Sequence, residues 1–224
     1  MRVAPDAVLS PPGPGGPNVA PGPVNYRVVR TLLVATTNRD KVREIGRVLA
    51  GGSYQLQTLA DWPRLAEPEE TGQTFEENAR AKALYYATAT GALTVAEDSG
   101  LIIDALGGAP GVQSARFGGV GASYPQKFAL IHEALRARNS AGSPARFVCA
   151  LALAHRGRIL FEARGTVEGR MAPEPKGEGG FGYDPIFYYP PYGRTLGEAS
   201  AEEKAAVSHR GEAFRKLAEF LRQV

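Results

Sequence analysis

The chain has 224 residues and a formal net charge of +3, with 43% hydrophobic and 22% charged residues. These values are typical of a soluble globular enzyme with one large α/β domain or two lobes around a shared core. The weak, dispersed positive charge suits an anionic small molecule and argues against a nucleic-acid-binding module. The single cysteine, Cys149, excludes an intramolecular disulfide and a cysteine-cluster zinc site, and its apolar surroundings predict that it is buried. No run of about 18 apolar residues exists, so we expect no membrane span.

The first 25 residues differ in composition from the rest. They contain seven prolines and four glycines without a periodic apolar face. Such a stretch has too little apolar area to offset the entropy of ordering, so we expect a disordered tail. It lacks the apolar segment of a secretory signal. The folded domain is therefore expected to span residues 26–224.

Strand-like and helix-like patterns then alternate along the chain. β-Branched or alternating runs predict strands, and segments with one apolar face and a capping residue predict helices. The expected strands are residues 28–37, 54–59, 92–97, 146–155 and 158–169. The expected helices are residues 38–50, 74–89, 124–138 and a closing helical region from residue 200 to about residue 224.

The connections between these elements indicate the fold class. An Arg-Gly turn joins the last two strands, which predicts an antiparallel pair, whereas helices separate the earlier strands. A loop rich in glycine, proline and aromatic residues runs from Pro173 to Gly197. This arrangement predicts an α/β fold with a mixed central β-sheet flanked by helices.

The first candidate site is ATTNRDK, residues 35–41, at a strand-to-helix junction. Exposed backbone donors and the helix dipole favour an anion there, and Lys41 adds a formal charge. The alternative is a helix capped by Asn38 with a solvated lysine. No GxxxxGK[ST] phosphate loop occurs in the chain.

The second is the acidic stretch EPEETGQTFEENARAKA, residues 67–83, which carries five glutamates. Asn78 and Lys82 lie four residues apart and therefore share one helix face. The alternative is an acidic loop followed by a helix with ordinary surface charges.

The third is VAEDSGLIIDALGGAPG, residues 95–111, in which Glu97 and Asp98 follow an apolar run. We expect the strand to end at this pair, so that Asp98 projects into the crevice where open α/β sheets bind ligands. One carboxylate could hold Mg2+ or accept a proton from water while the other supports it. The alternative is that the pair caps a turn.

Two further segments offer groups that suit a nucleotide. GEGGFGYDPIFYYPPYG, residues 177–193, combines glycines with the flat faces of Phe181 and Tyr183, on which a base can stack. EEKAAVSHRG, residues 202–211, contains Lys204, His209 and Arg210, and the arginine can donate several hydrogen bonds. The alternatives are a mobile loop anchored by aromatic residues and three solvated surface groups.

Taken in order, these five blocks resemble the inosine/xanthosine triphosphate pyrophosphatase family, over residues 30–224. Members hydrolyse purine nucleoside triphosphates to monophosphate and pyrophosphate with Mg2+. They are homodimers with a long mixed sheet and a cleft between two lobes. The resemblance implies removal of ITP, dITP and XTP from the cytoplasmic nucleotide pool, without nucleic-acid or membrane partners.

The resemblance also implies roles for individual residues. Asp98 matches the catalytic proton acceptor and a metal ligand, and Glu69 is favoured over Glu70 as the second metal ligand. Asn38, Lys41 and Lys82 match phosphate contacts. The full set of expected substrate contacts is Thr36, Thr37, Asn38, Arg39, Asp40, Lys41, Lys82, Ser99, Phe181, Gly182, Tyr183, Asp184, Lys204, His209 and Arg210.

The sequence departs from the family pattern at two positions. Thr37 stands where glycine is frequent, and Glu97 stands where aspartate is also found.

Two alternative functions remain open, and the alternative enzyme is a pyrophosphatase of broader or pyrimidine specificity. A non-catalytic nucleotide sensor would need the cations but not the acidic residues. For base selection, we expect Arg210 to donate to the 6-carbonyl of the purine, which adenine lacks.

Overall fold

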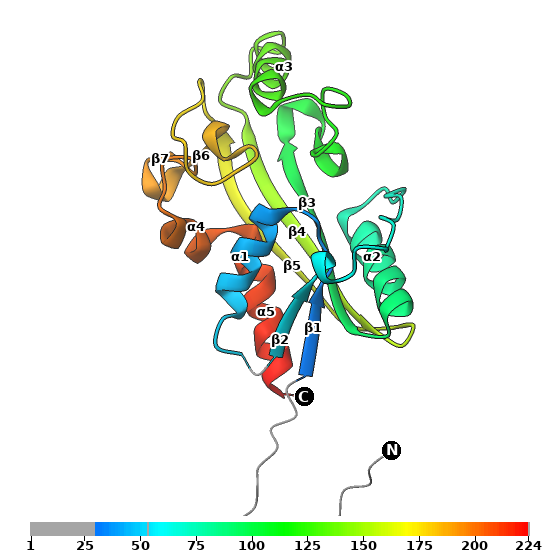
Figure 1. Cartoon of the computed structure of the whole chain (residues 1–224). Coiled ribbons are helices and arrows are strands. Elements are labelled where there is room, and N and C mark those ends of the chain that lie inside the picture. Colours follow the sequence, from blue (N-terminus) through cyan, green and yellow to red (C-terminus); the bar gives the residue numbers. More distant parts are fainter. Residues whose placement is uncertain (1–29, 53, 224) are drawn as a thin grey trace, which may run out of the picture.

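The computed structural model describes residues 30–52 and 54–223. The expected tail, and the expected start of the first strand at Val28, lie outside these residues. Seven strands form one mixed sheet in the order β2-β1-β3-β4-β5-β6-β7. Three long strands, β3, β4 and β5, run through the molecule and connect its two ends (Figure 1). This arrangement confirms the α/β fold with a mixed central sheet.

The bounds of the elements are as follows. The strands are β1 (Arg30–Val34), β2 (Tyr54–Thr58), β3 (Leu93–Ile103), β4 (Pro144–His155), β5 (Arg158–Met171), β6 (Phe187–Tyr189) and β7 (Arg194–Thr195). The helices are α1 (Arg39–Leu49), α2 (Phe75–Thr90), α3 (Tyr124–Arg136), α4 (Ala201–Val207) and α5 (His209–Gln223).

The strand β3 changes its neighbours along its length. Its first residues pair in parallel with β1, from Leu93 to Val95, while the antiparallel ladder with β4 continues from Thr94 to Ile103. Because β1 ends at Val34, the second half of β3 has a sheet partner on one side only. The prediction that this strand ends at Glu97 was wrong. The apolar residues Leu101 and Ile103 continue it into a second core.

Helices cover both faces of the sheet at one end of the molecule. The helix α2 packs on one face, where Leu33, Ala79 and Val148 belong to one buried cluster. The helices α1 and α5 pack on the other face, where Leu32, Ile45 and Phe214 belong to another. The alternating side chains of β1 therefore enter different cores, as the period of a strand requires.

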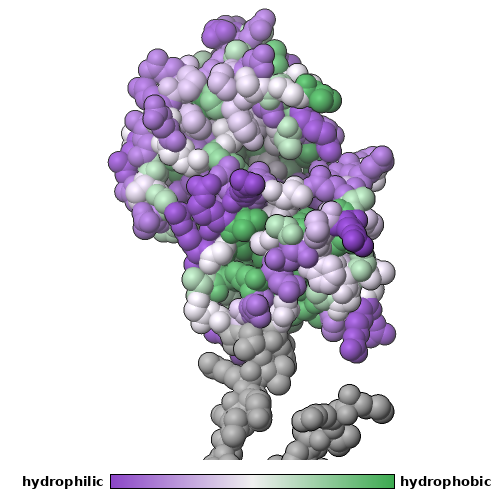
Figure 2. Space-filling model, in the orientation of Figure 1, coloured by the Kyte–Doolittle hydropathy of each residue, from purple (hydrophilic) through white to green (hydrophobic). Residues whose placement is uncertain are grey.

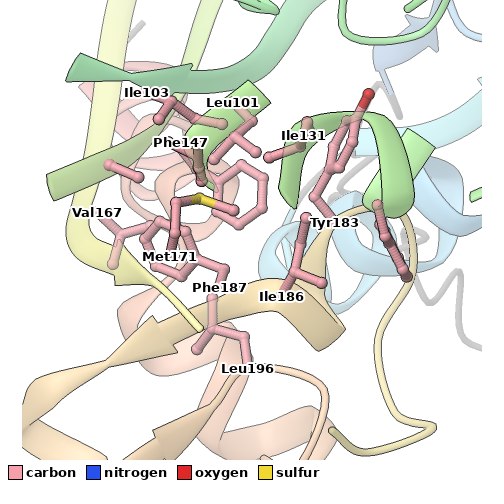
Figure 3. Close-up of a cluster of buried hydrophobic side chains, with 13 residues drawn as sticks. Leu101, Ile103, Ile131, Phe147, Val167, Met171, Tyr183, Ile186, Phe187 and Leu196 are labelled. Atoms are coloured by element: carbon pink, nitrogen blue, oxygen red, sulfur yellow. The ribbon is translucent and has the colours of Figure 1, made fainter. Parts of the chain in front are cut away.

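A third cluster forms the core of the other end of the molecule. Phe147, Met171, Phe187 and Leu196 lie together there, and Ile131 of α3 belongs to the same cluster (Figure 3). The two short strands β6 and β7 bring part of this cluster. The prediction of a loop from Pro173 to Gly197 missed them because strands of two or three residues are too short to show a period.

The expected helix caps agree with the structure, whereas the first strand ends at Val34 and not at the expected Thr37. Asn38 caps α1, and the capping boxes of Thr74 and Ser200 are both present. The closing region consists of two helices, which break at Ser208. Cys149 is buried and free, as expected.

Most of the visible face is polar or charged, and apolar residues gather mainly in the half that contains β1 and β2 (Figure 2). Among the described residues, no helix is long and apolar enough to cross a membrane.

Candidate active site

A cleft opens beside the half of β3 that β1 does not cover. It collects side chains from the start of α1, from β3, from the segment after β3, from the glycine-rich loop and from α4 and α5. Its lining residues include Asn38, Lys41, Glu70, Asp98, Ser99, Ser114, Tyr124, Phe181, Gly182, Tyr183, Asp184, Lys204, His209 and Arg210.

Asp98 lies on the α2 side of β3 and is only 6% exposed. Its Oδ2 accepts a hydrogen bond from Asn78 Nδ2 at 2.9 Å, and its Oδ1 lies 4.0 Å from Lys82 Nζ. Burial raises the pKa of this carboxyl, although Lys82 and Asn78 act in the opposite direction. A carboxylate with a raised pKa in a cleft is suited to accept a proton.

Glu97 points to the opposite face of β3, toward α1 and α5. Its Oε1 lies 2.9 Å from Lys41 Nζ and 3.1 Å from Arg210 Nε, and Cys149 Sγ donates to Oε2 at 3.6 Å. Burial alone would raise the pKa of Glu97, but Lys41 and Arg210 hold it well below its usual range. Glu97 therefore stays ionised and aligns two cations behind the cleft.

The acidic position nearest Asp98 is Glu70. Its Oε1 lies 2.5 Å from Lys82 Nζ, so one ammonium group contacts the carboxylates of Glu70 and Asp98. Burial opposes ionisation of Glu70, whereas Lys82 and Arg116 lower its pKa. Glu69 is exposed and does not line the cleft. The geometry thus favours Glu70 over the expected Glu69, in the register that the sequence left open.

Phe181 lies at the other end of the cleft beneath two cations. Lys204 Nζ lies 4.5 Å and the Arg210 guanidinium carbon 5.4 Å from the centre of its ring. Lys204 also forms a buried ion pair with Asp184, which accepts the Phe181 N–H at 2.7 Å. Gly180 adopts a φ of +67°, and a Cβ there would overlap Asp184 Oδ2. Only glycine suits that position.

His209 and Arg210 close this end from α5. The ring of His209 stacks on Phe147 with centroids 5.0 Å apart, and its buried Nδ1 has no hydrogen-bond partner among residues 30–52 and 54–223. Burial holds the pKa of His209 well below its usual value, so the ring is neutral at pH 7. The Arg210 Nη2 donates to Ser99 Oγ at 2.8 Å. A neutral imidazole with a free nitrogen and a guanidinium suit the polar edge of a base.

The turn before α1 is only partly in the cleft. Asn38 and Lys41 line it, and Asn38 Oδ1 accepts the backbone N–H groups of Asp40 and Lys41 at 2.9 and 3.1 Å. The other expected contacts of this turn, Thr36, Thr37, Arg39 and Asp40, do not line it. The Thr37 hydroxyl donates to Glu67 at 2.6 Å, and Asp40 pairs with Arg43 at 2.5 Å.

Sequence reasoning missed Glu44, which holds two cations of the site, and Tyr124, which lines the cleft. Glu44 contacts Lys204 Nζ and Arg210 Nη1, each at 2.7 Å. Glu44 follows Lys41 by three residues on the same helix, so the two side chains share one helix face, and this spacing could have pointed to Glu44. Tyr124 lines the cleft and packs edge-on against Tyr183, with centroids 5.4 Å apart. No pattern in the sequence pointed to that residue.

Carboxylate oxygens of Glu70 and Asp98 are the donors that could hold a metal ion here. Among the described residues, no group of three or more histidine, cysteine, aspartate or glutamate side chains forms a metal site. Mg2+ is commonly bound by one or two carboxylates together with substrate phosphates. The hard-oxygen donor pair therefore suits Mg2+ that arrives with a nucleotide.

Comparisons with known proteins agree with this architecture. A family model described as the Ham1 family matches residues 32–220. A dITP/XTP pyrophosphatase from an Exiguobacterium species is 47% identical over 186 residues, which cover 83% of this chain and 94% of that protein. One from Thermus thermophilus is 47% identical over 188 residues, covering 84% and 90%. The structure of a HAM1 protein from Coxiella burnetii matches with a TM-score of 0.82 and 38% identity, over 88% of this chain and 100% of that one.

Proposed function

Because the chain belongs to the Ham1 family, we propose that it hydrolyses purine nucleoside triphosphates such as ITP, dITP and XTP to the monophosphate and pyrophosphate. The observation that carries this proposal is the buried carboxylate of Asp98, which lines, together with Glu70, a cleft that also contains aromatic and cationic side chains. Lys82 contacts both carboxylates, although it does not itself line the cleft. In this proposal the carboxylates and lysines act on the phosphate groups, and the aromatic pocket binds the base.

In the proposed mechanism Asp98 accepts a proton from the water that attacks the α-phosphorus. Asn78 orients the carboxylate through its 2.9 Å hydrogen bond, and burial keeps the pKa of Asp98 raised. The bond between the α-phosphorus and the bridging oxygen then breaks, and pyrophosphate leaves. Lys41 and Lys82 stabilise negative charge on the phosphates, which is the main requirement of phosphoryl-group hydrolysis.

We propose Mg2+ as the cofactor, held by Asp98 and Glu70 rather than Glu69. When bound, Mg2+ supplies neutralisation of phosphate charge and polarises the phosphorus centre. Its carboxylate ligands would leave Lys82 free to contact phosphate oxygens. Removal of divalent ions with EDTA should abolish turnover, and addition of Mg2+ should restore it.

Recognition of the base is proposed to rest on His209 and Arg210. The Arg210 side chain engages Glu97, Glu44 and Ser99, and these contacts use three of its five N–H groups. The two others, and the unpartnered Nδ1 of His209, can meet the carbonyl groups of hypoxanthine or xanthine. Adenine presents an amino donor at the same position, which leaves buried donors unpaired.

Product identification tests the proposal directly. The protein is incubated with Mg2+ and a panel of ITP, XTP, ATP, GTP, UTP and TTP, and products are separated by ion-exchange chromatography. We expect IMP or XMP with pyrophosphate. Diphosphate with inorganic phosphate would refute the reaction, and equal rates with ITP and UTP would support the alternative of broader or pyrimidine specificity.

Assembly and location follow as parts of the same proposal. We propose a homodimer, which light scattering coupled to size-exclusion chromatography would test. The substrates belong to the cytoplasmic nucleotide pool, so we propose that the enzyme acts in the cytoplasm.

A further inference from the structure

Arg116 is a cation beside Glu70, which lines the cleft, and neither the mechanism nor base recognition assigns it a role. Its Nη2 lies 3.5 Å from Glu70 Oε2, and its side chain is 49% exposed. The same nitrogen lies 3.5 Å from the backbone oxygen of Glu70, and Nε lies 3.3 Å from Gln113 Oε1. These contacts are long for a guanidinium. A phosphate could replace them at little cost.

Two buried side chains fix the backbone immediately before Arg116. The Tyr183 hydroxyl donates to Ser114 O at 2.8 Å, and Lys127 Nζ donates to Ala115 O at 2.7 Å. Ser114 Oγ in turn accepts the backbone N–H of Leu101 at 2.9 Å, which ties the segment to β3. Arg116 therefore has a half-exposed, loosely held side chain on a backbone that is fixed by hydrogen bonds.

Lys127 is unusual because it is buried without a counter-ion. It is 4% exposed, and no carboxylate of the described chain lies within 4.0 Å of its ammonium group. Its hydrogen bond to Ala115 O and its position 4.9 Å from the centre of the Tyr124 ring are its polar contacts in this part of the chain. Burial of a cation is costly. A role in holding the Arg116 segment explains why the lysine is there.

A chain of contacts connects Arg116 to the carboxylate of Asp98 and, through Ser99, to the base pocket. Arg210 lies over Phe181 and donates to Ser99, the residue after Asp98. Asp98 lies near Lys82, Lys82 contacts Glu70, and Glu70 faces Arg116. Phosphates held near Lys82, Glu70 and Asp98 would therefore lie close to the Arg116 guanidinium.

We propose that Arg116 binds the β- and γ-phosphates, the part that leaves as pyrophosphate, and that Lys127 positions it. The inference rests on the proposed function, since it concerns the leaving group of that reaction. Lys41, by contrast, is held at 2.9 Å by Glu97, whereas the nearest carboxylate to Arg116 in the described part of the chain lies 3.5 Å away. The planar guanidinium fork matches two phosphate oxygens at once.

Binding measurements on product fragments test this assignment. Isothermal titration calorimetry with pyrophosphate and with IMP is carried out on wild type, Arg116→Ala and Arg116→Lys. We expect Arg116→Ala to weaken pyrophosphate binding roughly 10- to 100-fold and to leave IMP binding within about twofold. Arg116→Lys should give an intermediate loss, because it keeps the charge and lacks the fork.

Two further variants provide the controls. Arg138→Ala removes an exposed arginine whose guanidinium donates to Ala134 O at 3.1 Å, and the variant should bind pyrophosphate like wild type. Lys127→Met should weaken pyrophosphate binding while IMP binding persists, and retained IMP binding shows that the variant is folded. Loss of IMP binding together with pyrophosphate binding would reject the positioning role of Lys127.

The outcomes separate this inference from the proposed function. If wild type releases pyrophosphate from ITP and Arg116→Ala binds pyrophosphate as tightly as Arg138→Ala, the inference is wrong and the function stands. If wild type releases no pyrophosphate from ITP or XTP, the proposed function is wrong and the inference falls with it.

Discussion

Replacement of Glu97 by glutamine should destabilise the fold as well as the site. The variant removes the carboxylate that lies 2.9 Å from Lys41 Nζ and 3.1 Å from Arg210 Nε. Removal of one partner from a buried ion pair typically costs about 3–5 kcal/mol. Arg210 keeps Glu44 at 2.7 Å, and the Lys41 side chain is 18% exposed and can turn to water. We therefore expect the lower value, about 3 kcal/mol.

Urea and thermal unfolding at pH 7 measure this loss. For a domain of this size, 3 kcal/mol corresponds to a fall in Tm of about 6–12 °C. The matched control is Glu168→Gln, whose side chain is 69% exposed and lies 3.3 Å from Arg146. It should cost less than about 1 kcal/mol. A Glu97→Gln loss as small as that of the control would refute the reasoning.

The pH dependence of this difference has a definite sign. The pKa of Glu97 is lowered in the folded protein from the ordinary value of 4.5. The stabilisation is therefore complete above about pH 5 and decreases as the pH falls below the unfolded value. Wild type and Glu97→Gln should differ fully at pH 7 and should converge in acid. A difference that grows toward acid would contradict the assignment of Glu97 as an ionised carboxylate.

Three other predictions follow from the same geometry. Asp98→Asn should lower kcat by about 10²- to 10⁴-fold with Tm nearly unchanged, and near wild-type turnover would exclude Asp98 as the base. Arg210→Ala should reduce the preference for ITP over ATP by at least about tenfold, measured as the ratio of kcat/KM, and unchanged selectivity would reject its role. Gly100→Ala should destabilise by about 1–3 kcal/mol or more, because the new Cβ would lie 2.4 Å from Ser114 Oγ and 2.5 Å from Gly111 O. Gly142→Ala meets nothing within 4 Å and should lie within about 0.5 kcal/mol of wild type in the same urea titration.

The strands and helices with a clear period were predictable from the sequence. The helix α1 and its Asn38 cap followed from local chemistry, as did the capping box at Thr74. Lys41 and Asp98 both line the cleft, and their joint role there was implied by the family resemblance.

What could not be predicted depends on contacts between distant residues. The strand β3 continues past Asp98 because the core around Leu101 and Ile103 is built by α3 and β6, far along the chain. The choice between Glu69 and Glu70 depends on where Lys82 points. Glu44 and Arg210 are 166 residues apart in sequence, and they meet because α5 packs beside α1. The sequence alone does not show this packing.

The alternation of side chains along β3 limits how this protein can change in evolution. Glu97 serves the cations of α1 and α5, and Asp98 serves the opposite face with Asn78. Insertion or deletion of one residue between Leu93 and Glu97 would exchange the two faces and place each carboxylate among the other's partners. We expect length changes to be tolerated at exposed loop tips such as Arg156–Gly157, whereas β3 can vary only by substitution.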